Sequence, residues 1–143
     1  MINVIGRGSR RAFVITCGTQ EGYGPTGKTH TVQAVETACQ DWMAERAASG
    51  QPFITGSVTT GTVVYAWPEG EGKAGRGSET VALFSGVVST LYNAAMSNEQ
   101  VSDLLTDLAG FLAERFGQTR VYVEYIDETW VVERSEGSTP TGN

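Results

Sequence analysis

The chain of 143 residues is 40% hydrophobic and 18% charged, which is the composition of one folded domain and excludes a disordered chain. Its formal net charge of −6 argues against a general nucleic-acid binder, because such proteins need a basic surface. With no long apolar run and no signal-peptide pattern, we expect a cytoplasmic protein without membrane partners. Two cysteines and one histidine predict no disulfide scaffold, no metal site and no cofactor.

The first third of the chain predicts a strand followed by a helix. An apolar, β-branched run predicts a strand over Ala12–Cys17, after a flexible lead-in or short edge strand at residues 1–10. Apolar side chains at helical spacing then predict a helix that starts at Thr29 or Thr31 and ends near Ser49. Both cysteines fall on apolar positions, so we expect them in the core.

The middle of the chain predicts two strands and a loop. Residues Phe53–Trp67 favour one bent strand, with two short strands turning near Thr60-Gly61 as the alternative. The segment Pro68–Ser78 is rich in glycine and charge, which indicates a mobile loop. Apolar residues over Glu79–Ser89 predict the next strand.

The last third begins with the clearest helix. Ser97 followed by Gln100 is a capping-box pattern, and a continuous apolar stripe runs from there to the closing Gly117. Alternating residues over Arg120–Val132 predict the last strand. Residues 135–143 are polar and are expected to form a disordered tail.

This order of elements predicts an α+β fold, a ferredoxin-like βαββαβ sandwich that spans residues 11–134. It places two helices on one face of an antiparallel four-stranded sheet. The other face would be open, so we expect a homo-oligomer, a dimer or higher, that covers it. The topology also predicts that three connections meet at one end of the sheet: Gly18–Lys28, Pro68–Ser78 and Gly117–Arg120.

The one sharp motif follows the first strand. Gly22, Gly27, Lys28 and Thr29 have the spacing of a phosphate-binding loop, in which backbone N–H groups and a lysine hold an anion. Over these eight residues the chain resembles the Walker A signature of P-loop nucleotide hydrolases. Such loops leave their strand directly, however, and sit in a parallel sheet, whereas Gly18–Glu21 intervene here and the chain has too few elements.

We therefore predict a non-enzymatic oligomeric module that binds a small anionic, possibly nucleotide-like, ligand at this end of the sheet. The expected ligand-binding residues are the loop glycines, the motif residues and three nearby cations: Gly22, Gly24, Gly27, Lys28, Thr29, Lys73, Arg76 and Arg120. One alternative is a phosphoryl-transfer or nucleotide-hydrolysing enzyme that uses Lys28 and Thr29. Another is a protein-interaction or assembly domain without a ligand.

Overall fold

The computed structural model describes residues 1–22 and 27–135, which form five strands and two helices. In chain order these elements are β1 (Ala12–Gly18), α1 (Val32–Ala48), β2 (Ser57–Gly70), β3 (Lys73–Val87), α2 (Asn98–Arg115), β4 (Arg120–Tyr125) and β5 (Glu128–Glu133). The predicted α+β class is confirmed. Among these residues, neither helix is long and apolar enough to cross a membrane.

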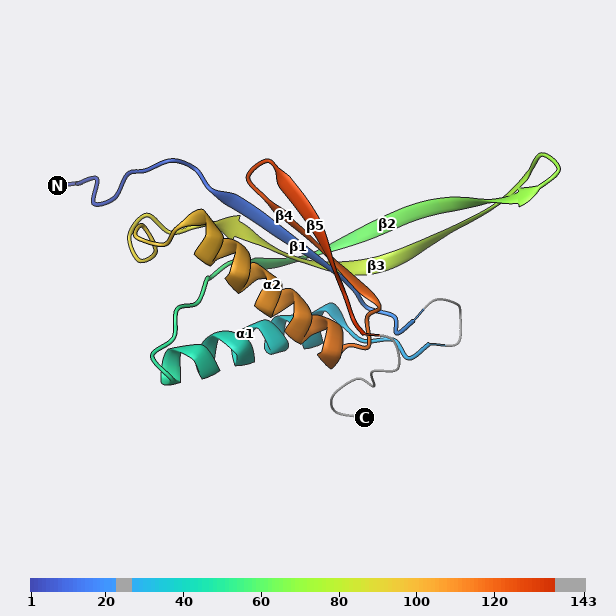
Figure 1. The fold of residues 1–143 in the computed structure, drawn as a ribbon, viewed down its shortest axis with the longest axis horizontal. Helices are drawn as coiled ribbons and strands as arrows, with labels where there is room; N and C mark the ends of the chain where they lie inside the picture. Colours follow the sequence, from blue (N-terminus) through green and yellow to red (C-terminus); the bar gives the residue numbers. More distant parts are fainter. Residues whose placement is uncertain (23–26, 136–143) are drawn as a thin grey trace.

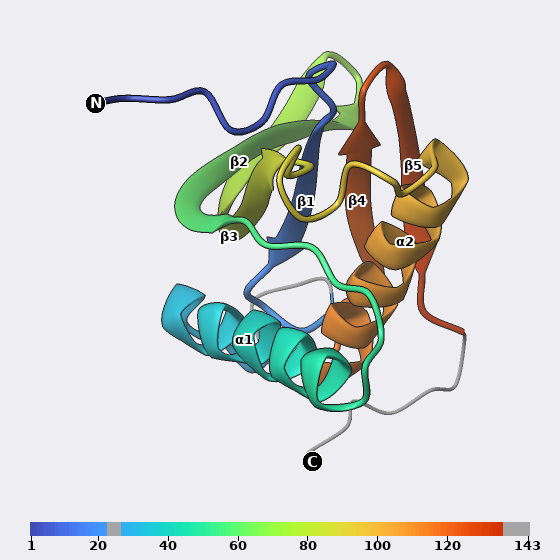
Figure 2. The same cartoon turned by 90° about the vertical axis from the view of Figure 1, so that its left-hand side faces the viewer.

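All five strands belong to one antiparallel sheet with the order β2-β3-β1-β4-β5 (Figures 1 and 2). Strand β1 is central and is bonded to β3 on one side and to β4 on the other. The predicted four-stranded sheet is therefore wrong in its strand count. The fifth strand, β5, extends the sheet beyond β4.

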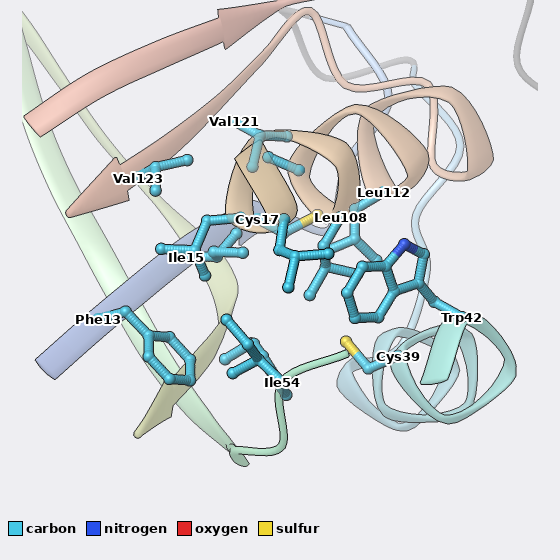
Figure 3. Close-up of a cluster of buried hydrophobic side chains, with 14 of the residues drawn as sticks. Phe13, Ile15, Cys17, Cys39, Trp42, Ile54, Leu108, Leu112, Val121 and Val123 are labelled. Carbon is cyan, nitrogen blue, oxygen red and sulfur yellow. The ribbon is translucent and has the colours of Figure 1, made fainter. Parts of the chain in front are cut away.

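The core lies between the helices and one face of the sheet. Because side chains alternate along a strand, Phe13, Ile15 and Cys17 all point to the same face of β1, and all three are buried. Val121 and Val123 of β4 join them, and Figure 3 shows these side chains packed together with residues of both helices. Burial of this apolar surface is the main force that holds the helices on the sheet.

Both helices begin where side chains can satisfy their free backbone N–H groups. The Thr31 hydroxyl accepts a hydrogen bond from Ala34 N at 3.0 Å, so α1 is capped by Thr31 and not by Thr29. At α2 the predicted capping box is confirmed: Ser97 Oγ accepts from Gln100 N at 3.1 Å, and Gln100 Oε1 accepts from Ser97 N at 2.8 Å.

The segment predicted as a mobile loop, Pro68–Ser78, is the end of a long hairpin. Strand β2 continues to Gly70, and β3 starts at Lys73. Glu71 and Gly72 form the two-residue turn, with φ of 50° and 74°, which fits the turn type that matches strand twist. The loop prediction is wrong because a high glycine content indicates turns, but it does not reveal that two segments pair with each other as strands.

The end of the chain contains a second hairpin. The single strand predicted over Arg120–Val132 is wrong, because the chain reverses at Ile126 and Asp127 and returns as β5. Ile126 has a φ of 56°, a conformation that is costly for a β-branched residue. Because sequence patterns expect glycine, asparagine or aspartate at such a position, they do not indicate a turn here. The predicted tail falls largely on residues 136–143, which lie outside the described residues.

Replacing Leu105 or Leu108 by alanine is expected to lower the free energy of unfolding by about 2–5 kcal/mol, because both side chains are 1% exposed in the middle of α2. Asp103→Ala, on the exposed side of the same helix, serves as the control and should change it by less than about 0.5 kcal/mol. Urea denaturation measures the free energy of unfolding of all three variants. Unchanged stability of both leucine variants would contradict the packing of α2 on the sheet.

Candidate functional site

The described residues on the two sides of the predicted phosphate-binding stretch are held by backbone pairing. Gln20 and Thr29 form a β-bridge, and Glu21 N donates to Lys28 O at 2.8 Å, so the two sides of the stretch pair with each other. The N–H of Glu21 is thus used inside the protein. Gly27 lies within this paired segment, and Gly24 falls outside the described residues.

Two of the three connections expected at this end of the sheet do meet. Gly22 N donates to Gly117 O at 3.4 Å, and Gln118 Nε2 donates to Gln20 O at 2.8 Å. Arg120, at the start of β4, forms an ion pair with Glu133 at 3.0 Å. The positions of these two loops relative to each other therefore follow the predicted topology.

The third connection does not join them. Gly18, the end of β1, pairs with Val81, and β3 extends beyond that point to Lys73. At about 3.3 Å per residue these eight residues carry the hairpin roughly 26 Å away from the end of β1. We call this projecting part of the hairpin, residues 62–79, the arm (Figure 1). Lys73 and Arg76 lie on the arm and are not placed beside Lys28.

The arm carries two exposed aromatic side chains on one face. Tyr65 is 50% exposed and Trp67 is 46% exposed, and their ring centroids are 5.9 Å apart with an interplanar angle of 31°. Tyr65 pairs with Gly77 and Trp67 pairs with Gly75 on the neighbouring strand. A side chain at either glycine would collide with the ring opposite it, so the glycines are what allow both rings to lie against β3.

A carboxylate flanks this aromatic pair on each side. Glu79 pairs with Val63, one step nearer the body on the same face, and its Oε1 accepts from Gln20 N at 3.3 Å. At the other side, the Glu69 carboxylate lies beside the position that a Gly75 side chain would occupy. Tyr65, Trp67, Glu69 and Glu79 form what we call the arm site. Its chemistry is that of a cation-binding surface: two π faces between two negative charges.

The open face of the sheet continues from the arm site towards the other edge. Because residues directly opposite each other in a sheet share a face, Val63 of β2 is on the same face as Tyr122 of β4 and Val131 of β5. These three side chains are 42%, 48% and 48% exposed. The arm site does not follow from the sequence, because β2 continues past Trp67 to Gly70 only through its pairing with β3.

The cysteines are not candidates for chemistry. Burial, with smaller contributions from Cys39 and Glu79, raises the pKa of Cys17 to about 12, and burial raises the pKa of Cys39 to about 11. Both thiols are therefore protonated near neutral pH and are poor nucleophiles. Their predicted place in the core is confirmed. In the described part of the chain, no group of three His, Cys, Asp or Glu residues is arranged to hold a metal ion.

Comparison with known proteins gives a fold likeness and no sequence family. No family model and no curated protein matches the chain. Among solved structures, a phage SAM lyase in complex with S-methyl-5'-thioadenosine has a TM-score of 0.60 at 18% identity, over 92% of this chain and 97% of that chain. A phage SAM lyase in the apo state has a TM-score of 0.56 at 17% identity, over 94% and 97%.

These neighbours overturn the function predicted from the sequence. Both are structures of an enzyme, whereas we expected a non-enzymatic module that binds an anion. A phosphoryl-transfer enzyme and an assembly domain without a ligand do not fit these neighbours either.

Proposed function

We propose that this protein is an enzyme that cleaves S-adenosylmethionine and releases S-methyl-5'-thioadenosine. The observation that carries the proposal is the shared fold, which extends over nearly the full length of both this chain and a SAM lyase that holds this nucleoside. Fold likeness alone does not establish an activity, so the proposal also needs a site with suitable chemistry. The arm site supplies it.

The arm site suits the charge and shape of this substrate. S-adenosylmethionine carries a positive sulfonium next to an adenosine, and aromatic faces attract such a cation while they also stack on a purine. Glu79 is half-buried beside Tyr65 on the same face and adds a negative charge. The chain as a whole has a net charge of −6, which favours the approach of a cation. The proposed substrate contains a nucleoside, and its sulfonium is opposite in charge to the anionic ligand predicted from the sequence.

The chemistry of the cleavage places modest demands on the protein. The bond that breaks joins the sulfur to the carbon chain of the methionine part, and the sulfur keeps the electron pair. The same carbon forms a new bond to a carboxylate oxygen of the substrate itself, so the methionine part leaves as a lactone and no further reactant is needed. The leaving group is thus a neutral thioether that needs no proton. The positive charge at sulfur disappears during the reaction. If the protein stabilised the charged substrate more strongly than the transition state, it would slow the cleavage. Orientation of the methionine part is the larger contribution.

We further propose that the working form is a homo-oligomer. The arm site lies on an open sheet face, where a substrate would be exposed to water on one side. Cleavage in a water-excluded site requires a cover, and a second copy of the chain can provide it by packing on the apolar side chains of this face. Tyr122 and Val131 are half exposed there. The substrate and the second copy of the chain would then both contact the open face of the sheet.

Purified protein should convert S-adenosylmethionine to S-methyl-5'-thioadenosine, measured by liquid chromatography. Trp67→Ala should raise KM about 3- to 30-fold, the scale of a lost cation–π contact. Glu79→Gln should lower kcat/KM about tenfold or more, because the charge is lost while an amide oxygen can still accept from Gln20 N. Val64→Ala is the matched control, since Val64 pairs with Ser78 on the opposite face of the arm.

Equal activity of the parent and both arm-site variants would remove the arm site from the proposal. If Val64→Ala were as impaired as Trp67→Ala, the losses would reflect damage to the arm and not to a site on one of its faces. Circular dichroism and a thermal midpoint for each variant separate misfolding from loss of function.

Light scattering should give a mass of two or more chains. Tyr122→Lys should shift the protein towards the monomer, because it places a charge on the open face at a half-exposed apolar position. Asp103→Lys changes an exposed residue on the helical side and should leave the mass unchanged. A monomeric parent at micromolar concentration would contradict the oligomer.

A further inference from the structure

A cavity of about 560 Å³ lies between the N-terminal segment and the connection from β3 to α2. Figure 1 shows both segments at the end of the molecule opposite the arm, so this cavity is separate from the arm site. Arg7, Arg10 and Arg11 line it, and none of its lining residues within 1–22 and 27–135 is a carboxylate. Three of the ten lysine and arginine residues therefore gather in one cavity of a chain that has sixteen acidic residues.

The guanidinium group of Arg11 is held in place by neutral acceptors. Its Nη1 donates to Met96 O at 2.8 Å and to Asn98 Oδ1 at 3.1 Å, and its Nη2 donates to Asn93 O at 3.3 Å. The Tyr125 hydroxyl is 3.5 Å from Nη1. These contacts fix the position of the side chain but do not neutralise its charge. Arg11 therefore presents a fixed positive charge at the cavity wall.

Arg7 and Arg10 are exposed and make no ion pair or hydrogen bond through their side chains within residues 1–22 and 27–135. In contrast, Arg46 and Arg115 each pair with an aspartate. Three like charges close together repel one another, and an anion between them relieves that repulsion. The planar guanidinium fork is the side chain best matched to phosphate oxygens.

Hydroxyl groups of the cavity add further donors. Ser89 Oγ accepts from Leu91 N at 3.2 Å and from Tyr92 N at 3.1 Å, and Ser97 Oγ accepts from Gln100 N. Since both oxygens already accept hydrogen bonds from the backbone, each hydroxyl hydrogen is available to a ligand. Both serines line the cavity. The three guanidinium groups and two hydroxyl groups thus offer more hydrogen-bond donors than the two oxygens of a carboxylate can accept. A phosphate, with more oxygens, suits them better.

We propose that this cavity binds a small phosphate-bearing molecule through Arg7, Arg10 and Arg11. This site is independent of the proposed cleavage of S-adenosylmethionine, because the two lie at opposite ends of the molecule (Figure 1). The ligand class is set by three guanidinium groups, the absence of carboxylates among the described lining residues and the available hydroxyl hydrogens. It differs from the anion site expected at Gly22–Thr29 both in place and in residues.

Isothermal titration calorimetry with inorganic pyrophosphate at low ionic strength tests the proposal. The double variant Arg7→Gln/Arg10→Gln should bind about tenfold more weakly or worse, the scale of losing charge-assisted hydrogen bonds. Arg11 is left intact because it also holds the connection before α2. Arg76→Gln is the matched control: it removes one exposed arginine from the arm and should bind as the parent does.

Citrate, titrated in parallel, separates phosphate recognition from general attraction of anions and should bind more weakly than pyrophosphate. Equal affinities for the two would overturn the phosphate assignment. The proposal as a whole fails if the parent does not bind pyrophosphate, or if Arg76→Gln loses as much affinity as the double variant. Any cleavage of S-adenosylmethionine should be the same in the parent and the double variant, so failure of either proposal is seen separately.

Discussion

Strand β1 carries the pairing on which the rest of the structure depends. It is bonded to β3 and to β4, and its inward side chains, Phe13, Ile15 and Cys17, form the floor of the core against both helices. Its short length has a second effect. β1 ends at Gly18, whereas β3 extends further, to Lys73. Beyond Gly18 the β2–β3 hairpin therefore has no pairing with β1 and projects from the sheet as the arm. The core and the arm thus follow from the same register.

The projection of the arm explains why exposed aromatic side chains occur in a protein with an otherwise ordinary core. Tyr65 and Trp67 lie where no helix reaches, and Gly75 and Gly77 across from them leave space for the rings. Such a face would promote unspecific association if it had no use. The proposed binding of a cationic nucleoside between the rings and Glu79, under a second copy of the chain, would give it one. The arginine-lined cavity at the opposite end has the reverse charge and is suited to a different ligand.

The sequence predicted those parts of the fold that depend on local patterns. The capping box at Ser97 and the apolar, β-branched run of β1 are local, and both elements were predicted correctly. The arm was missed because its strands are defined by cross-strand pairing over a glycine-rich segment. The turn at Ile126 was missed because its positive φ opposes β-branched preference. The arm site could not be predicted, since Glu79 reaches the aromatic pair only through the register of β2 and β3.

Carbon-13 NMR of S-adenosylmethionine labelled at its methyl group tests the central claim most directly. The methyl group is bound to a positive sulfonium in the substrate and to a neutral thioether in S-methyl-5'-thioadenosine, so its resonance moves upfield when the bond to the methionine chain breaks. With the protein present, our account predicts that the substrate resonance is replaced by the thioether resonance faster than in buffer alone. Loss of substrate at the same rate with and without protein would contradict it.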